Sequence, residues 1–183
     1  TAGVKGLRDT KFVQSGKLLL SYGGALNPIH RDPVPLLESF SNFGSNDIHC
    51  MLRGDEVERI QNLVTKRQAN KHVTIKGYLP FDKYMTEAQG YDVLLFFGNS
   101  CPMQIPGKLF RYISTGKLIL YLKNMSRDLE DPCEKILLQY GNSVIVPNEA
   151  ESISRSLKDL IDKKKEGLIK NIDISHMKRY DSD

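Results

Sequence analysis

The sequence predicts an α/β fold in which a doubly wound parallel sheet of about six strands carries helices on both faces. Short apolar segments typical of buried strands alternate about six times with longer segments of helical period, which favours parallel strands joined by right-handed crossovers. The 183 residues are 40% hydrophobic and 26% charged, values typical of one globular domain or of one domain with an appendage.

Each element is predicted from its own pattern. The strands are short apolar runs: KLLLSY (17–22), DIHCMLRG (47–54), HVTIKGYL (72–79), YDVLLFFG (91–98), KLILYL (117–122) and SVIVP (143–147). The helices are PVPLLESFSNF (33–43) with proline in its first turn, DEVERIQNLVTKRQA (55–69) with an acidic first turn, PFDKYMTEAQG (80–90), GKLFRYIST (107–115), a segment near 128–139, and a long helix from about residue 150.

Three parts are expected along the chain. Residues 1–16 form a leader or an inter-domain segment, 17–165 form the α/β domain, and 166–183 form a carboxyl-terminal helical tail. Because the sequence begins with Thr1 rather than methionine, we expect it to be an excised piece of a larger protein. The longest uncharged apolar runs, VLLFF and LILYL, are far shorter than the ~20 residues that cross a bilayer, and no signal peptide is visible.

Charge and cysteine content limit the partners and the compartment. The net charge of +4 comes from basic residues interleaved with acids, which argues against nucleic acid and suits a phosphate-bearing small ligand. Cys50, Cys101 and Cys133 are odd in number and lack the spacing of a zinc site, so we expect reduced thiols in the cytosol. Cys101 is interpreted as a small filler, and the histidines His49 and His72, in predicted strands, as structural.

The loop after the first strand is a candidate binding loop. In parallel α/β sheets, ligands bind outside the carboxyl ends of the strands. Gly23 and Gly24 would let a ligand approach the backbone closely, and His30 and Arg31 would meet negative charge near the next helix start. A tight strand-to-helix turn explains the two glycines equally well.

The loops after the second and third strands are further candidates. Arg53 is suited to fork onto phosphate oxygens, and a surface salt bridge with Asp55 or Glu56 explains it equally well. In the third loop, the backbone of Tyr78 and Leu79 would hydrogen-bond the edge of a base while their side chains flank its ring.

A fourth loop ends in the turn Pro106–Gly107, followed at once by a cation, Lys108. A helix that begins at about Gly107 presents free N–H groups and a positive dipole end, which Lys108 would strengthen as an anion site. Simple punctuation of the helix by Pro–Gly is the alternative.

The succession of these segments resembles a known family. LLLSYGGALNPIHRDPVPLLESF, IHCMLRGDE, VTIKGYLPFDKYMTEAQGYDVLLFF, IPGKLFRYISTGKLILYL and GNSVIVPNEAESISRSLKDLI are similar to the carboxyl-terminal domain of retaining GT-B glycosyltransferases (glycosyl transferases group 1, family 4-like), which have two Rossmann-like domains. The resemblance covers nearly the whole chain from residue 17 onward. Its most specific part is P-x-K-L-F-x-Y and the following G-K, within 106–117. It implies that 17–165 is a Rossmann-like nucleotide-sugar-binding domain.

The resemblance also implies which residues bind the donor. Gly23 and Gly24 match the loop that faces the donor phosphates, Tyr78 and Leu79 the base-contacting segment, and Gly107, Lys108 and Leu109, entered through Pro106, the helix start whose amides take the pyrophosphate. Transfer passes through an oxocarbenium-like sugar with a departing diphosphate, so Arg53, Lys108 and Arg31 would stabilise that diphosphate's charge. No catalytic residue is assigned to this chain, and neither a cofactor nor a metal is expected.

The sequence departs from the family pattern at two positions. The family commonly carries two glutamates eight positions apart, the first near the transferred sugar and the second bonded to the nucleotide ribose. Met103 and Arg111 occupy these positions here. Arg111 lies one helical turn after Gly107, so we expect it to face the nucleotide and count it among the donor-binding residues. A carboxylate accepts protons from both ribose hydroxyls, whereas a guanidinium can only donate. Either the ribose is held differently, or the donor is unusual, or this copy binds poorly.

The function expected from the resemblance is donor binding in a glycosyltransferase. The donor would be a nucleotide sugar, of UDP or GDP, and a sugar or lipid-linked acceptor would bind an amino-terminal domain absent from this chain, which alone would be inactive. Two alternatives remain open: half of a nucleotide-sugar epimerase, and a non-catalytic binding or scaffold domain. We expect carbohydrate biosynthesis in the cytoplasm, with peripheral association at the inner membrane face as a variant.

Overall fold

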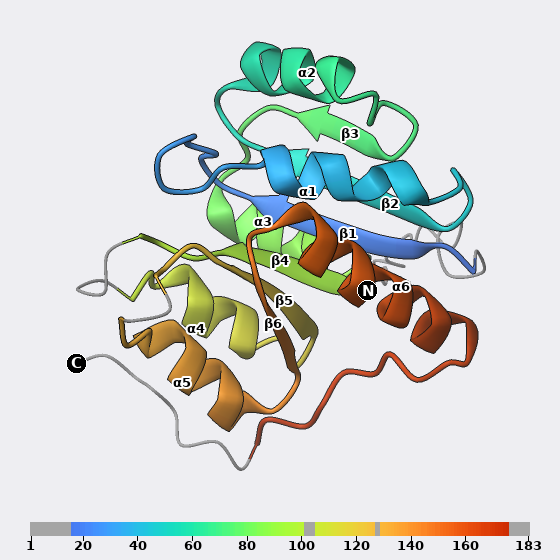
Figure 1. Cartoon of the computed structure of the whole chain (residues 1–183). Coiled ribbons are helices and arrows are strands. Elements are labelled where there is room, and N and C mark those ends of the chain that lie inside the picture. Colours follow the sequence, from blue (N-terminus) through green and yellow to red (C-terminus); the bar gives the residue numbers. More distant parts are fainter. Residues whose placement is uncertain (1–15, 101–104, 127–128, 176–183) are drawn as a thin grey trace, which may run out of the picture.

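The computed structural model describes residues 16–100, 105–126 and 129–175, and these form one parallel sheet with helices on both faces (Figure 1). The strands are β1 (Leu18–Gly23), β2 (Ile48–Arg53), β3 (Val73–Lys76), β4 (Val93–Phe97), β5 (Leu118–Lys123) and β6 (Ser143–Pro147). Their order across the sheet is β3-β2-β1-β4-β5-β6, and every neighbouring pair is parallel. The predicted doubly wound α/β fold, with six strands, is confirmed.

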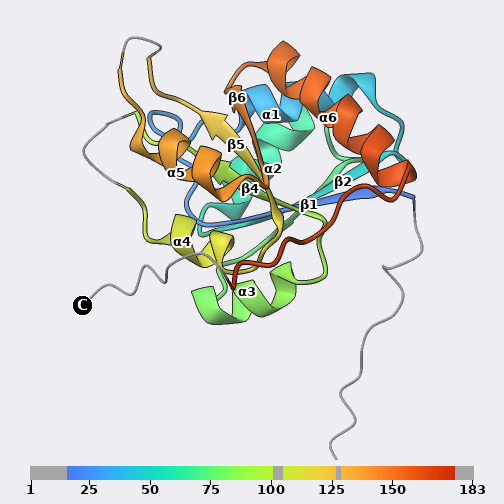
Figure 2. The same ribbon diagram turned by 90° about the horizontal axis from the view of Figure 1, so that it is seen from below.

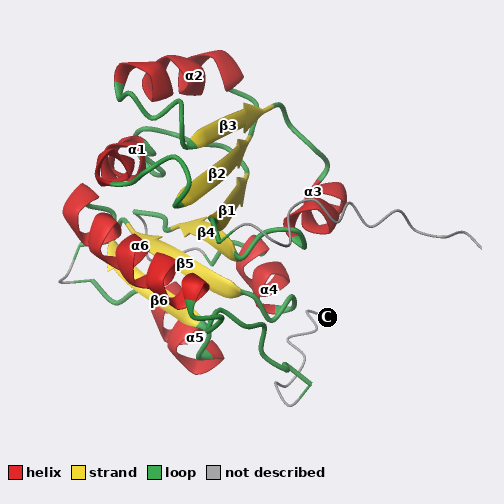
Figure 3. Cartoon of the chain, turned by 90° about the vertical axis from the view of Figure 1, so that its right-hand side faces the viewer, coloured by secondary structure: helices red, strands yellow, loops and turns green. Residues whose placement is uncertain are grey.

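The helices divide into two layers. They are α1 (Val34–Ser39), extended by the 3-10 turn η1 (Phe40–Asn42), α2 (Val57–Lys66), α3 (Phe81–Ala88), α4 (Lys108–Ile113), α5 (Pro132–Tyr140) and α6 (Ala150–Lys165). Buried residues of α1, α2 and α6 share one core cluster, and those of α3, α4 and α5 share the other. Figure 3 shows α1 and α6 on one side of the sheet and α3 and α4 on the other.

The central strands are buried on both faces, which explains their continuous apolar runs. In β4, Val93, Leu95 and Phe97 point into the cluster under α1, α2 and α6, while Leu94 and Phe96 point into the cluster under α3, α4 and α5. The order in which the chain adds strands reverses between β1 and β4, because β2 and β3 lie to one side of β1 whereas β5 and β6 lie beyond β4. Such a switch point is where ligands bind in open α/β sheets.

The helix predicted near 128–139 begins later in the structure than expected. The helix predicted near 128–139 begins at Pro132, because the Asp131 side chain caps it by accepting a hydrogen bond from the Cys133 amide at 2.9 Å. Asp128 lies outside the described residues.

No helix among the described residues is long and apolar enough to span a bilayer.

The helical tail predicted for 166–183 is wrong for its described part, because 166–175 contains no helix. Gly167, with φ of 70°, follows the end of α6 in the left-handed conformation that terminates helices. The chain then crosses toward the α3 and α4 side (Figure 2), where the Ile172 N–H donates to the Gly116 carbonyl at 2.8 Å and Ile174 packs against the core there. Of the leader predicted for 1–16, residues 1–15 lie outside the described residues.

Candidate functional site

An open cleft of about 360 Å³ lies at the carboxyl end of β1, next to the switch point. Six residues line it: Gly23, Gly24, Phe81, Gly107, Lys108 and Arg111. All except Phe81 are among the donor-binding residues predicted from the sequence. They come from three segments far apart in the chain, which the parallel topology brings to one edge of the sheet.

The Gly23–Gly24 turn forms one wall of the cleft, and no larger residue suits either position. A Cβ on Gly23 would lie 2.8 Å from the Tyr84 ring. Gly24 has φ of +145°, which residues with a side chain rarely adopt, and a Cβ there would lie 2.7 Å from Lys108 Nζ. The two glycines therefore serve the turn and the close approach of Lys108 together.

Lys108 reaches across the cleft from the first residue of α4. Its Nζ donates to the Gly23 carbonyl at 2.9 Å and lies 4.3 Å from the centroid of the Tyr22 ring. Burial, together with the smaller effect of the positive charge of Arg31, lowers the pKa of Lys108 to about 7. A neighbouring anion would favour the charged ammonium, so this lysine is poised to gain a proton when a phosphate binds.

Hydroxyl groups beneath the glycine turn fix its floor. Tyr84 OH lies 3.1 Å from Ser21 Oγ and 3.2 Å from Tyr112 OH. Burial raises the pKa of Tyr84 to about 12, so the floor of the cleft remains neutral at physiological pH. The turn thus rests on packed, hydrogen-bonded aromatic side chains rather than on a flexible loop.

The opposite rim of the cleft is formed by the first residues of α3 and the end of α4. Arg111 Cζ lies 5.5 Å from the centroid of the Phe81 ring, and its Nη2 forms an ion pair with Asp82 Oδ1. The prediction missed Phe81 and Asp82. An aromatic residue and an acid directly after the predicted base-contacting segment were the available signal.

Comparisons with known proteins identify the architecture of the chain. No protein-family model and no curated protein sequence matches the chain. Solved structures do match: Anabaena HepE in complex with UDP has a TM-score of 0.62 at 13% identity over 84% of this chain, and S. aureus MnaA with UDP has 0.59 at 11% over 92%. Sucrose-phosphate synthase from Thermosynechococcus elongatus has 0.62 at 11% over 84%.

The chain has the fold of one half of a GT-B protein. It spans 42% of HepE, 43% of MnaA and 38% of the synthase, which fits one of the two Rossmann-like halves. The cleft between the β1 turn and α4 lies at the carboxyl edge of this half.

Arg53 does not belong to the cleft. Its Nη2 pairs with Glu87 Oε2 at 2.7 Å, and its Nη1 donates to the Gly77 carbonyl at 3.1 Å. The salt-bridge alternative is therefore correct in kind, but the partner is Glu87 of α3 rather than Asp55 or Glu56. The Arg53 guanidinium, which was predicted to bind phosphate, is instead bonded to the Glu87 carboxylate and the Gly77 carbonyl.

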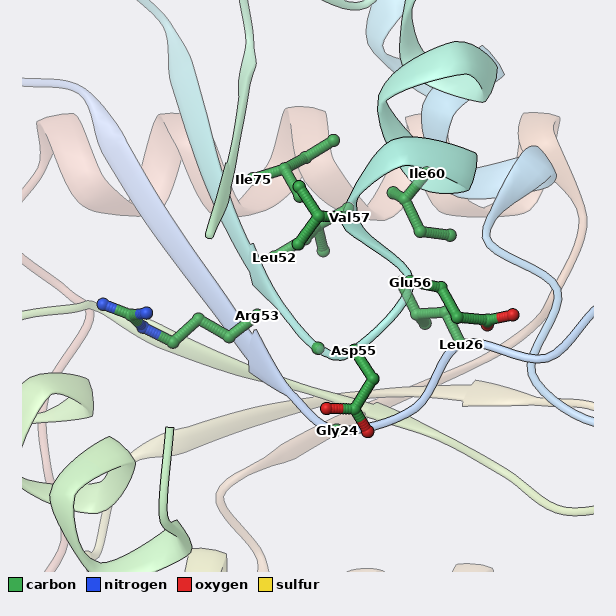
Figure 4. A pocket seen from close by; sticks show the side chains of 10 residues that line it. Gly24, Leu26, Leu52, Arg53, Asp55, Glu56, Val57, Ile60 and Ile75 are labelled. Atoms are coloured by element: carbon green, nitrogen blue, oxygen red, sulfur yellow. The ribbon is translucent and has the colours of Figure 1, made fainter. Parts of the chain in front are cut away.

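A second hollow at the carboxyl ends, beside Arg53, is too small for a ligand. Figure 4 shows the Arg53 side chain directed away from the apolar residues Leu52, Val57, Ile60 and Ile75. The cavity volume is about 10 Å³, which is barely enough for one water molecule. The GT-B half therefore offers the Gly24–Lys108 cleft, and not this hollow, to a ligand.

The remaining predicted residues lie around the cleft with different exposures. Tyr78 is 66% exposed just before α3, whereas Leu79 packs against the α3 and α4 core. Leu109 is buried, and its N–H already donates to the Pro106 carbonyl at 2.9 Å, so that amide is engaged in the turn. Met103 lies outside the described residues.

The loops after β1 and β4 are joined above the switch point. Arg31 Nη2 donates to Asn99 Oδ1 at 3.1 Å, and His30 Nδ1 lies 2.7 Å from Ser100 Oγ. Asn124 Nδ2 donates to the carbonyls of Gly98 and His30. The positive charge of Arg31 also acts on Lys108, whose pKa it lowers.

The cysteines and histidines of the core are structural. Cys50 and Cys133 are buried free thiols, and burial raises the pKa of Cys133 to about 12; Cys101 lies outside the described residues. His72 is buried against the Phe40 ring, and burial lowers its pKa. Across the described ranges, no group of three or more His, Cys, Asp or Glu residues is placed to hold a metal ion.

Proposed function

We propose that the chain is the donor-binding half of a glycosyltransferase and that its cleft binds the diphosphate of a nucleotide sugar. The observation that carries the proposal is the approach of Lys108 Nζ to the Gly23–Gly24 turn at the switch point. A cation facing a glycine turn, with the positive charge of Arg31 acting on it, is suited to phosphate oxygens. HepE and MnaA, which share the fold, have been solved with UDP, and HepE also with UDP and glucose.

The chemistry asked of this half is electrostatic. As the bond between the sugar and the diphosphate breaks, negative charge grows on the departing diphosphate. Lys108, once protonated, and Arg31 would stabilise that charge. The acceptor and the groups that act on it would come from a further domain, so the chain alone should bind the donor without transferring its sugar.

The finer assignments belong to the same proposal. We infer a donor of UDP or GDP, retention of the anomeric configuration, no metal or organic cofactor, and carbohydrate biosynthesis in the cytoplasm, with the full-length protein also able to associate with the inner membrane face. The anomeric configuration of the product formed by the full-length protein, measured by NMR, tests the retaining assignment.

Calorimetric titration of the chain with UDP, GDP, ADP and the corresponding nucleotide sugars tests the central proposal. We expect at least one nucleoside diphosphate to bind and, at 100 times its Kd, to raise the free energy of unfolding by about 2.7 kcal/mol. Absence of binding to the chain and to the full-length protein would show that the cleft has another role. Supplying a nucleotide sugar to the full-length protein and looking for an epimerised sugar separates transferase from epimerase.

A further inference from the structure

The rim of the cleft opposite the glycine turn carries an ion pair between two helices. Arg111 on α4 lines the cleft together with Phe81, and its guanidinium pairs with Asp82 in the first turn of α3. The same guanidinium lies over the Phe81 ring, 5.5 Å from its centroid. Two contacts therefore hold Arg111, and through it Asp82, beside the cleft.

The ion pair between Arg111 and Asp82 is mostly exposed to solvent. The side chains of Arg111 and Asp82 are 54% and 84% exposed. Exposed ion pairs add little to stability, because solvent screens them. Within the described residues, the contact to Asp82 uses Nη2 of Arg111 and Oδ1 of the carboxylate, so Oδ2 has no hydrogen-bond partner. Asp82 is thus an acceptor oriented by a cation and open to solvent.

The positions of the neighbouring groups define what part of a ligand reaches this acceptor. Arg111 follows Lys108 by three residues on α4, so its Cα lies about 4.5 Å farther along the helix axis. Tyr78 and Leu79 precede α3 and are joined by Pro80 to the first turn, which carries Asp82. A nucleoside diphosphate with its phosphates at Lys108 and its base at Tyr78 would place its ribose between them, at the Arg111–Asp82 pair.

We propose that Asp82, held by Arg111, accepts hydrogen bonds from the two ribose hydroxyls of the bound nucleotide, so that the cleft selects ribonucleoside diphosphates. The inference rests on the proposed function, since it assigns the middle of the same cleft. A carboxylate is purely an acceptor and suits a vicinal diol, whereas Arg111 can only donate. The acceptor therefore comes from α3, rather than from position 111 on α4, where the resemblance implies one.

The test separates the ribose contact from the phosphate contact with three probes. UDP, 2′,3′-dideoxy-UDP and inorganic pyrophosphate are titrated into the parent chain, Asp82→Ala and Glu58→Ala, with the GDP series run in parallel. Glu58→Ala is the matched control, because it removes an exposed first-turn acid from α2. In the parent and in Glu58→Ala, we expect the dideoxy analogue to bind about tenfold more weakly than the ribonucleotide, the effect of losing hydrogen bonds to a charged group. In Asp82→Ala, both should bind equally, with pyrophosphate unaffected.

An exchange of the two charges tests whether the carboxylate alone matters or its placement by Arg111 matters too. Asp82→Arg alone should abolish the preference for ribose. Asp82→Arg combined with Arg111→Glu restores an oriented carboxylate at the rim, and we expect part of the preference to return.

Two kinds of failure remain distinct. If no nucleoside diphosphate binds either the parent chain or the full-length protein, the proposed function is wrong. If nucleoside diphosphates bind but the parent does not distinguish ribose from dideoxyribose, or Asp82→Ala keeps the distinction, the donor-binding proposal survives and the role of Asp82 is overturned.

Discussion

The two ends of the cleft are built in different ways. At the end where we propose that the phosphates bind, the phosphate end, Gly23, Gly24 and Lys108 are fixed by buried aromatic side chains and by a backbone conformation that few residues adopt. At the nucleoside end, Tyr78 is 66% exposed and Arg111 pairs with a carboxylate that is itself mostly in solvent. Substitutions at the phosphate end should therefore disturb fold and binding together, whereas substitutions at the rim should change binding alone.

The largest effect is expected from Gly24→Ala, at the phosphate end. At φ of +145° the added Cβ is strained, and we expect the free energy of unfolding to fall by about 1–3 kcal/mol. The new methyl group also meets Lys108 Nζ, so nucleoside diphosphate binding should weaken at least tenfold. Urea denaturation and calorimetric titration measure the two effects.

Gly107→Ala is the matched control for that substitution. Gly107 lines the same cleft, but its φ is −56° and a Cβ there meets nothing within 4 Å. Its stability should stay within about 0.5 kcal/mol of the parent. Equal losses in Gly24→Ala and Gly107→Ala would contradict the contrast between a strained and an unstrained glycine.

The next effect concerns the affinity contributed by Lys108. Lys108→Ala should weaken UDP or GDP binding about tenfold at pH 7, which corresponds to one charge-assisted hydrogen bond of about 1.5 kcal/mol. Lys66→Ala, at an exposed position in the last turn of α2, serves as the control. Equal titration curves for Lys108→Ala and the parent would remove Lys108 from the site.

The pH dependence of binding follows from the same lysine. In the free chain, burial and Arg31 lower the pKa of Lys108 to about 7, and a bound phosphate raises it, because the anion favours the ammonium. Above pH 7 the complex then holds more protons than the free chain, so affinity should fall as pH rises, by up to about tenfold per pH unit. Lys108→Met should remove this slope, and an identical slope in that variant would disprove the assignment.

The unliganded fold responds to pH with the opposite sign. The pKa of Lys108 in the folded chain is below its unfolded value of about 10.4, so the unfolded chain binds more protons between pH 7 and 10. The contribution of Lys108 to stability should therefore increase with pH in this window. Chemical denaturation of the parent and Lys108→Met at pH 7 and pH 9 measures the difference.

Arg53→Met sharpens the comparison from outside the cleft. The substitution breaks the half-buried pair with Glu87 and the bond to the Gly77 carbonyl, so we expect a loss of about 1 kcal/mol of stability. Nucleoside diphosphate affinity should change less than twofold. A large loss of nucleoside diphosphate affinity with an unchanged free energy of unfolding would show that Arg53 does contact the phosphates.

The smallest effect on stability is expected at the rim. Arg111→Gln breaks an exposed ion pair, and we expect the free energy of unfolding to fall by less than about 1 kcal/mol. Thermal denaturation without ligand checks this value. A larger loss would show that the pair supports the packing of α3 against α4, and the two ends of the cleft would then not differ in kind.

The strands, and the edge of the sheet at which the cleft lies, could be predicted from the sequence because they follow from the local pattern of apolar residues. Apolar runs such as those of β1 and β4 lie on strands buried on both faces, so pattern and burial agree. Gly24 and Lys108 could be placed at one edge because the carboxyl ends of parallel strands meet there.

Contacts between distant segments were beyond that reasoning. Arg53 is captured by Glu87, 34 residues away, and periodicity does not show which face of α3 turns toward β2. Phe81 enters the cleft for the same reason, through the packing of α3. The segment 166–183 was predicted to be a helical tail, yet its described part contains no helix, and its Ile172 N–H donates to the Gly116 carbonyl.

The hydrogen bond between Ile172 and Gly116 also bears on the order in which the fold is completed. Gly116 follows α4, and a Cβ there would lie 2.3 Å from the Ile172 carbonyl oxygen, so only glycine lets the late segment lie against the end of α4. During synthesis, at about 5–20 residues per second, all six strands are complete several seconds or less before Ile172 leaves the ribosome. The turn after the helix that carries Lys108 thus gains its contact to Ile172 only after the residues of all six strands have been synthesised.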